Sequence, residues 1–320
     1  MDDFKKTIEE ELVHFNQLLE SYLSSKNNFL DTILKYITVQ KGKQLRPIFT
    51  LLCAKMGGEI NQQTYRAAVT IEVLHISSLL HDDIIDNADE RRNSLSVNAL
   101  WKNKAALKSG NFLFFQSINE LLLNEDFTIL NIVSDCVQKI IQGELLQLKK
   151  SKKRNMDYTT YFEIINGKTA ILLGTACAVG AQSTFKNKDY TKQLFEFGEK
   201  LGMAFQIKDD LFDYLNVNTG KSENNDIIEG KMTLPVLYSL NQCNQRERKK
   251  YLNLLKLSNK KDSQIEELKK MVIQNGGIAY SNEFMAKYIN EALTILHAFP
   301  ENETRNALEK IARYVAERKK

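Results

Sequence analysis

The sequence predicts an all-α protein, and three observations support this fold class. Only 14 glycines and 3 prolines occur among 320 residues, too few turn residues for a β-sandwich, a barrel or a doubly wound sheet. Apolar residues recur at helical spacing almost throughout the chain. No alternation of apolar and polar residues typical of strands persists. We therefore expect long helices packed around a common core.

Individual helices can be followed in order along the chain. An early helix is indicated by the apolar positions Leu12, Phe15, Leu18, Leu19 and Tyr22. Two further helices are expected to begin at Pro47 and Pro235, because each precedes an apolar run and a first-turn proline loses no helical hydrogen bond. A late helix is indicated by the positions Ile265, Leu268, Met271 and Val272.

The organisation of the chain predicts a single domain over residues 1–320. With 43% apolar and 26% charged residues, the composition is that of an ordinary globular protein. Polar loops are expected at 151–157, 216–231 and 259–262. No repeat and no linker rich in proline, glycine or serine separates these parts, so nothing divides the chain.

Two segments, 67–80 and 194–215, are apolar on nearly every face, which is typical of helices at the centre of a bundle. Each of them nevertheless ends in carboxylates with the spacing D-D-x-x-D. These two aspartate clusters are Asp82, Asp83 and Asp86, and Asp209, Asp210 and Asp213. Helical spacing puts His75 and Ser78 on the face shared by Asp82 and Asp86. In the second segment the residues that share a face are Gln206, Asp209 and Asp213, with Gly202 leaving room one turn lower.

The aspartate clusters require cations. Like charges four residues apart destabilise a helix, and ionised carboxylates near a buried cavity cost far more unless they are compensated. Oxygen ligands without histidine or cysteine favour Mg²⁺, which completes its coordination with water and phosphate oxygens. The alternative, a solvated helix end, suits a single D-D-x-x-D motif. Because the motif occurs twice, each time after an apolar helix, we favour a magnesium site.

Basic residues near the same landmarks could bind phosphate. Lys43 and Arg46 directly precede the helix expected at Pro47, so two cations and a positive helix terminus meet there. Arg91 and Arg92 follow the first cluster by about one turn. Further cations are Lys168, next to Thr169, and Lys221 and Lys231. Each lysine alone is typical of a solvated surface, but the set together indicates an anion site.

Several classes of function are excluded. A net charge of +4 from 44 basic and 40 acidic residues is too balanced for a nucleic-acid surface. The cysteines form no C-x-x-C pair, which argues against a zinc or redox site and indicates a reducing compartment. The N-terminus lacks the apolar region of a secretory signal, and the apolar stretch 169–181 is too short to span a bilayer. We therefore expect a cytoplasmic protein without a transmembrane segment.

Six segments in a fixed order now allow a comparison with known families. They are GKQLRP (42–47), LLHDDIIDNADERR (79–92), QGELLQ (142–147), GKTA (167–170), FQIKDDLFD (205–213) and GKSENNDIIEGKMTLP (220–235). With these segments the chain resembles the trans-isoprenyl diphosphate synthases, or polyprenyl synthetases. The resemblance implies an isoprenoid-synthase-type bundle of long helices around a central cavity, usually assembled as a dimer.

The resemblance also implies roles for individual residues. Both aspartate clusters would bind Mg²⁺, about three ions per site with substrate present, with Asp82, Asp86 and Asp209 as direct ligands. The allylic diphosphate would be contacted by Arg91, Lys168, Lys221 and Lys231. The diphosphate of isopentenyl diphosphate would be bound by Lys43, Arg46, His75 and Arg92. Thr169 and Gln206 would lie beside the reacting carbons.

The implied reaction needs no protein nucleophile. The allylic C–O bond ionises, the double bond of isopentenyl diphosphate attacks the cation, and a proton is then lost to the released diphosphate. In the family, small residues four and five positions before the first aspartate allow a longer product. Here these positions are Ser78 and Ser77, with Leu74 and Val73 one turn deeper, so we expect an all-trans product of about C30 to C40 for quinone side chains. The alternative for two serines is simple helix packing.

Departures from the family pattern leave alternatives open. The segment from Asp213 to Lys221 is shorter than usual and lacks a common glycine, and Gln44 replaces a common basic residue. These differences suggest one subunit of a heteromeric synthase with a small regulatory partner, as an alternative to a homodimer. A catalytically silent subunit and a terpene cyclase are further alternatives. The greasy product suggests a peripheral contact with a membrane.

Overall fold

The prediction of an all-α fold is confirmed. The computed structural model describes residues 4–40, 42–92, 94–153, 156–185, 187–214 and 225–318. Its helices are η1 (Lys6–Ile8), α1 (Glu9–Tyr22), α2 (Asn28–Val39), α3 (Leu45–Gly57), α4 (Gln62–Ile85), α5 (Val97–Leu123), α6 (Phe127–Lys153), α7 (Tyr158–Ile165), η2 (Asn166–Ala170), α8 (Ile171–Thr184), α9 (Lys188–Phe212), α10 (Asn225–Glu229), α11 (Leu234–Gln242), α12 (Gln245–Leu255), α13 (Asp262–Gln274), α14 (Gly277–His297) and α15 (Glu303–Glu317). Between α4 and α5, β1 (Glu90–Arg91) and β2 (Ser94–Leu95) form a short antiparallel hairpin.

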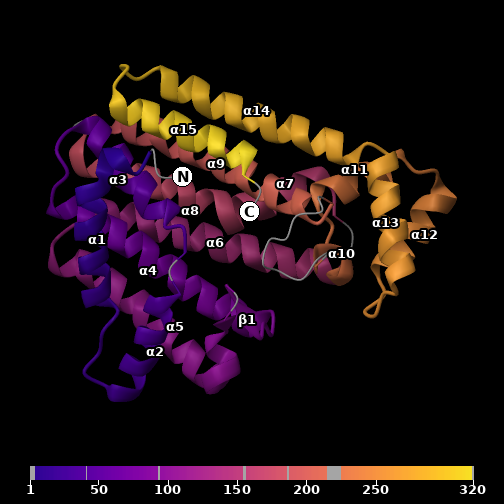
Figure 1. Ribbon diagram of the computed structural model, residues 1–320, viewed down its shortest axis with the longest axis horizontal. Helices are drawn as coiled ribbons and strands as arrows, with labels where there is room; N and C mark the ends of the chain where they lie inside the picture. The colour runs from indigo at the N-terminus through magenta and orange to yellow at the C-terminus, as the bar shows by residue number, and fades with distance from the viewer. Residues whose placement is uncertain are drawn as a thin grey trace.

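Helix α8 lies at the centre of the bundle. It packs against α3, α4, α6 and α9, and almost every one of its side chains is buried. Figure 1 shows α6, α8, α9, α14 and α15 running side by side, with α12 and α13 gathered at one end of the molecule. Within the described residues, one helical stretch, Tyr158–Thr184, is long and apolar enough to cross a membrane, and 83% of its apolar window is buried inside the fold. Its apolar surface is therefore used in packing.

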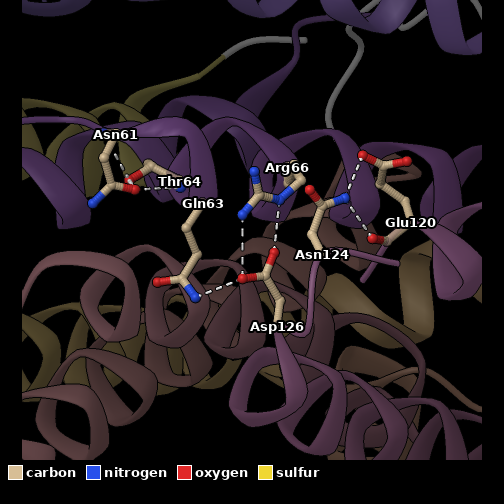
Figure 2. Close-up of polar contacts among 7 residues, drawn as sticks. All are labelled: Asn61, Gln63, Thr64, Arg66, Glu120, Asn124 and Asp126. Atoms are coloured by element: carbon tan, nitrogen blue, oxygen red, sulfur yellow. Dashed lines mark hydrogen bonds and ion pairs between the residues drawn. The ribbon is translucent and has the colours of Figure 1, made fainter. Parts of the chain in front are cut away.

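The start of α4 is fixed by a polar network (Figure 2). The Asn61 side chain accepts from the Thr64 backbone N–H at 3.0 Å, which satisfies an otherwise unpaired group of the first helical turn. Asp126, in the turn between α5 and α6, is buried and accepts from Arg66 Nε and from Gln63 Nε2, each at 2.7 Å. With this end fixed, the rigid helix determines where its last turn carries Asp82.

The segment η2 is a single turn of π-helix that lies close to α6 and α9. As predicted for Gly202, this glycine leaves room: a Cβ there would lie only 2.4 Å from the Cα of Ala170. On the other side, a Cβ at Gly167 would lie 2.9 Å from the Cα of Gly143 in α6. Short π-helical turns occur frequently at functional sites. The close backbone contacts therefore hold Lys168 and Thr169 between two long helices.

Candidate active site

The first aspartate cluster lies at the C-terminal end of α4, and its side chains point in two directions. Asp82 and Asp86 share one face, and burial raises the pKa of Asp82 while nearby Lys168 opposes the rise. Asp83 points elsewhere: it is buried, and Arg91 Nε donates to its Oδ1 at 2.9 Å. Arg91, which was expected at the allylic diphosphate, is therefore paired with a carboxylate of the same cluster. Asp82 and Asp86 remain as the pair on the open face.

In the second cluster, at the end of α9, each aspartate has a different partner. Asp209 accepts from Nη2 of Arg318 at 2.5 Å, and that guanidinium also stacks on the Phe205 ring with its carbon 3.6 Å from the centroid. Asp213 accepts from the backbone N–H groups of Asp226 and Ile227 at 2.6 and 3.2 Å. Burial, with the charge of Asp226, raises the pKa of Asp213 to about 6. Asp213 thus fixes α10 against α9.

Asp210 is buried within the protein. Tyr161 donates its hydroxyl to Oδ2 at 2.6 Å, and Gln206 Nε2 donates to Oδ1 at 3.1 Å. Burial and the charge of Asp226 raise the pKa of Asp210 to about 7, whereas both hydrogen bonds favour the carboxylate and oppose this rise. Both oxygens of Asp210 are therefore engaged by side chains of the protein.

Residues of η2 connect the ends of α4 and α9. The charge of Lys168 acts on Asp82, and the neighbouring Thr169 hydroxyl donates to Gln206 Oε1 at 2.7 Å. Lys168 is exposed, while Thr169 and Gln206 are half-buried. The structure thus places Lys168 by the first aspartate cluster and Thr169 with Gln206 by the second, as a shared site requires.

Most of the cations expected at isopentenyl diphosphate come together at the start of α3. Burial, then the charges of Arg46, Arg92 and Arg91, hold the pKa of His75 well below its usual value. Arg92 lies against Gly42, where a Cβ would be 2.5 Å from its Nη2. Such a concentration of positive charge is complementary to a diphosphate.

Two of the other predicted cations contact different parts of the protein. Lys43 donates from Nζ to the hydroxyl of Tyr314 in α15 at 3.2 Å. Lys231 forms ion pairs with Asp226 at 3.0 Å and with Glu229 at 2.8 Å, so the carboxylates of α10 engage it. Lys221 lies outside the described residues.

The four residues expected at the floor of the cavity have different surroundings. Ser77 is buried and donates to the Gly110 carbonyl of α5 at 2.9 Å, which is the helix contact that the packing alternative anticipated. Ser78 is half-buried, one turn below Asp82 on the same face. Leu74 belongs to an apolar cluster between α4, α5, α6 and α8, whereas Val73 packs in the main core.

Four site residues were not predicted from the sequence. Glu144 of α6 lies near Asp82, and burial followed by that charge raises its pKa. Glu72 is buried three residues before His75, with Arg46 and Arg92 opposing the rise of its pKa. The sequence held a signal for each of these two: Glu144 belongs to the segment QGELLQ, and Glu72 lies on the same helix as His75. Tyr161 and Arg318 had none, because their partners are 49 and 109 residues away in sequence.

Metal binding by these residues would depend on the substrate. Among the described parts of the chain, no three acidic, histidine or cysteine side chains converge closely enough to hold a metal ion. Mg²⁺ commonly binds through one or two carboxylates and takes its other ligands from water and substrate phosphates. The oxygen donors of Asp82, Asp86 and Asp209 fit this kind of site.

Comparisons with known proteins identify relatives of the chain in sequence and in structure. A model of the polyprenyl synthetase family matches residues 27–272, which include both aspartate clusters. The chain is 29% identical over 313 residues to heptaprenyl diphosphate synthase component 2 of Geobacillus stearothermophilus, covering 97% of each. It is 31% identical over 323 residues to the geranyl-diphosphate-specific all-trans-nonaprenyl-diphosphate synthase of Rhodobacter capsulatus, covering 99% of this chain and 98% of that protein. The crystal structure of polyprenyl synthase from Caulobacter crescentus CB15, complexed with calcium and isoprenyl diphosphate, has a TM-score of 0.93 at 28% identity, covering 100% of this chain and 98% of that one.

Proposed function

The chain belongs to the polyprenyl synthetase family and is a prenyltransferase, and we propose that it makes a medium-to-long all-trans polyprenyl diphosphate. It would add successive isopentenyl diphosphates to an allylic diphosphate until the product reaches about C30 to C40, for quinone side chains. The observation that carries this proposal is the position of Lys168 and Thr169 between the two aspartate clusters, with the cations around His75 nearby. Two anion sites suit a reaction between two diphosphates.

The reaction would depend on charge stabilisation. Asp82, Asp86 and Asp209 would hold Mg²⁺, which when bound neutralises the diphosphate and assists its departure. Lys168 adds positive charge on the same side, next to Asp82. The cations around His75 would bind the diphosphate of isopentenyl diphosphate and orient its double bond toward the allylic carbon.

Product length is proposed to depend on the face of α4 below Asp82. Ser78 is the small residue on that face, and the apolar cluster with Leu74 lies one turn deeper. Two relatives are named for heptaprenyl and nonaprenyl products, of seven and nine isoprene units, and the seven-unit length lies within the proposed range. A large side chain at Ser78 would close the path of the growing chain.

The test is mass analysis of the product. Purified protein with Mg²⁺, a short allylic primer and isopentenyl diphosphate should give a phosphorylated product of about C30 to C40. Ser78→Phe should shorten that product with little change in the rate of isopentenyl incorporation. Ser77→Phe is a control for structural disruption. Ser77 packs against α5, so a phenylalanine at this position would overfill the contact between the two helices. Equal products from wild type and Ser78→Phe, or a cyclised product without phosphate, would contradict the proposal.

A second candidate is a catalytic subunit that requires a partner. One relative is named component 2, and it aligns with 97% of this chain. Apolar side chains are exposed on the adjacent helices α5 and α6: Leu107, Phe115, Leu122, Leu123, Phe127, Ile141, Leu145 and Leu148. Exposed apolar surface of this kind is typical of protein contacts. Inactivity of the pure chain, restored by a second polypeptide, would favour the heteromer over the homodimer.

A further inference from the structure

A chain of hydrogen bonds leads from the buried Tyr161 of α7 to Thr169 of η2. We propose that Tyr161 and Asp210 are positioning residues that fix the amide of Gln206, with its oxygen toward Thr169 and the reacting carbons. The inference rests on the proposed function for its catalytic meaning. It assigns Asp210 a role within the protein, in contrast to its neighbour Asp209.

Each of the three links in this chain has the donor–acceptor distance of a hydrogen bond. The Tyr161 hydroxyl lies 2.6 Å from Asp210 Oδ2, Gln206 Nε2 lies 3.1 Å from Asp210 Oδ1, and Thr169 Oγ1 lies 2.7 Å from Gln206 Oε1. Tyr161 is 3% exposed and Asp210 is 5% exposed. The four residues belong to α7, η2 and α9, so the bonds join the π-helical turn to the helix that carries the second aspartate cluster.

Donor and acceptor chemistry fixes the direction of the amide. The group of Gln206 that meets Asp210 is its NH₂, which donates to Asp210 Oδ1. The amide oxygen must then face the opposite way, toward the hydroxyl of Thr169. Tyr161 satisfies the second carboxylate oxygen, and without it a buried acceptor would lose its partner.

This orientation matters for a reaction through an allylic cation. An amide oxygen is the negative end of its dipole, and a dipole fixed before reaction stabilises charge that develops in the transition state. If the amide rotated by half a turn, its NH₂ group would face the cation and oppose its formation. Asp210 and Tyr161 would prevent that rotation without contacting the substrate.

Exchanging the two functional groups tests this orientation. Asp210→Asn alone offers Gln206 a donor and should reverse the amide, while Gln206→Glu alone places two carboxylates together. When both substitutions are combined, the introduced asparagine can donate to the introduced glutamate, so an oxygen again faces Thr169. Each single variant should lose at least about tenfold in turnover. The double variant should recover most of that loss.

Tyrosine variants provide a matched comparison. Tyr161→Phe should lower turnover about tenfold, while the KM values of both substrates and the Mg²⁺ requirement stay within about twofold. Tyr158→Phe also removes a tyrosine hydroxyl from α7, but at a position beside the ring of Tyr280. This variant should leave turnover unchanged. A raised Mg²⁺ requirement in Asp210→Asn would instead make Asp210 a metal ligand and overturn the proposal.

Unfolding experiments separate this inference from the proposed function. The free energies of unfolding of the wild type, both single variants and the double variant form a cycle that needs no activity. A favourable coupling supports the hydrogen-bonded chain even if the product differs from the proposed one. Additive losses in the cycle, or a double variant as slow as the worse single variant, would overturn the inference.

Discussion

The individual aspartates differ in what each contacts, although the two clusters have the same spacing. Asp82 lies among other carboxylates, and burial raises its pKa while the charge of Lys168 opposes the rise. No ion pair to Asp82 occurs within the part of the chain that the structure describes. Asp209 forms an ion pair with Arg318, whose side chain is 4% exposed. The same substitution should therefore have opposite effects on stability at these two positions.

Replacing Asp82 and Asp209 by alanine tests this difference. Both variants should lose several powers of ten in turnover, because each removes an expected metal ligand. Asp82→Ala should unfold at the same or higher denaturant concentration, since it relieves repulsion. Asp209→Ala should lose about 2 kcal/mol, because it leaves the buried Arg318 unpaired. Urea unfolding measures the stability of both variants, and equal free energies of unfolding for Asp82→Ala and Asp209→Ala would contradict the proposed difference.

His75 makes stability depend on pH. Its pKa in the folded protein is lower than in the unfolded chain, so the unfolded state binds more protons as the pH falls below about 6.5. The folded state should therefore lose up to about 1.4 kcal/mol per pH unit below that value. His75→Gln should remove this component. Urea unfolding between about pH 5 and 8 measures the difference, and parallel curves for the two proteins would show that His75 titrates normally.

At the scale of elements, α4 acts as a rigid support between two polar ends. Its first turns are held by Asp126, its last turn carries Asp82, and Asp86 follows directly after its last residue. On the opposite side of the site, η2 is held by the close approach of Gly202 to Ala170. The positions of the charged groups therefore depend on packing and polar contacts made by uncharged residues and by Asp126.

The Asp126 network gives a stability prediction. Asp126→Ala should lower the free energy of unfolding by about 3 kcal/mol, because Arg66 loses a carboxylate that is only 4% exposed. Gln63→Ala is the matched control: it removes one neutral donor, keeps the ion pair, and should cost about 1 kcal/mol. Chemical denaturation compares the two. Equal losses would mean that the ion pair contributes little beyond a single hydrogen bond.

For the whole molecule, the exposed apolar side chains of α5 and α6 predict association. Phe115 is 67% exposed and Leu145 is 60% exposed, so both would be buried by a second chain on this face. Phe115→Arg with Leu145→Arg should convert an associated species to a monomer. Phe29→Arg, at an exposed phenylalanine of α2, should not. Analytical ultracentrifugation distinguishes these outcomes, and a wild-type monomer would remove this face from consideration.

The fold class and the ingredients of the site could be predicted from the sequence because they depend on local patterns. Helical spacing and scarce turn residues indicated the bundle, and it is confirmed. The repeated D-D-x-x-D spacing, with cations beside Pro47 and after Asp86, indicated where charge would gather. These features can be recognised in the sequence because the residues that form each of them lie within a few helical turns of one another.

The protein partners of the second aspartate cluster were decided by contacts between distant segments. Asp210 bonds to Tyr161 of α7, Asp213 to the backbone at α10, and Asp209 to Arg318 near the end of the chain. Ser77 likewise meets α5 while Ser78 stays on the face of Asp82. No spacing rule encodes these pairings, because they arise when separate helices pack and their buried polar groups must find partners.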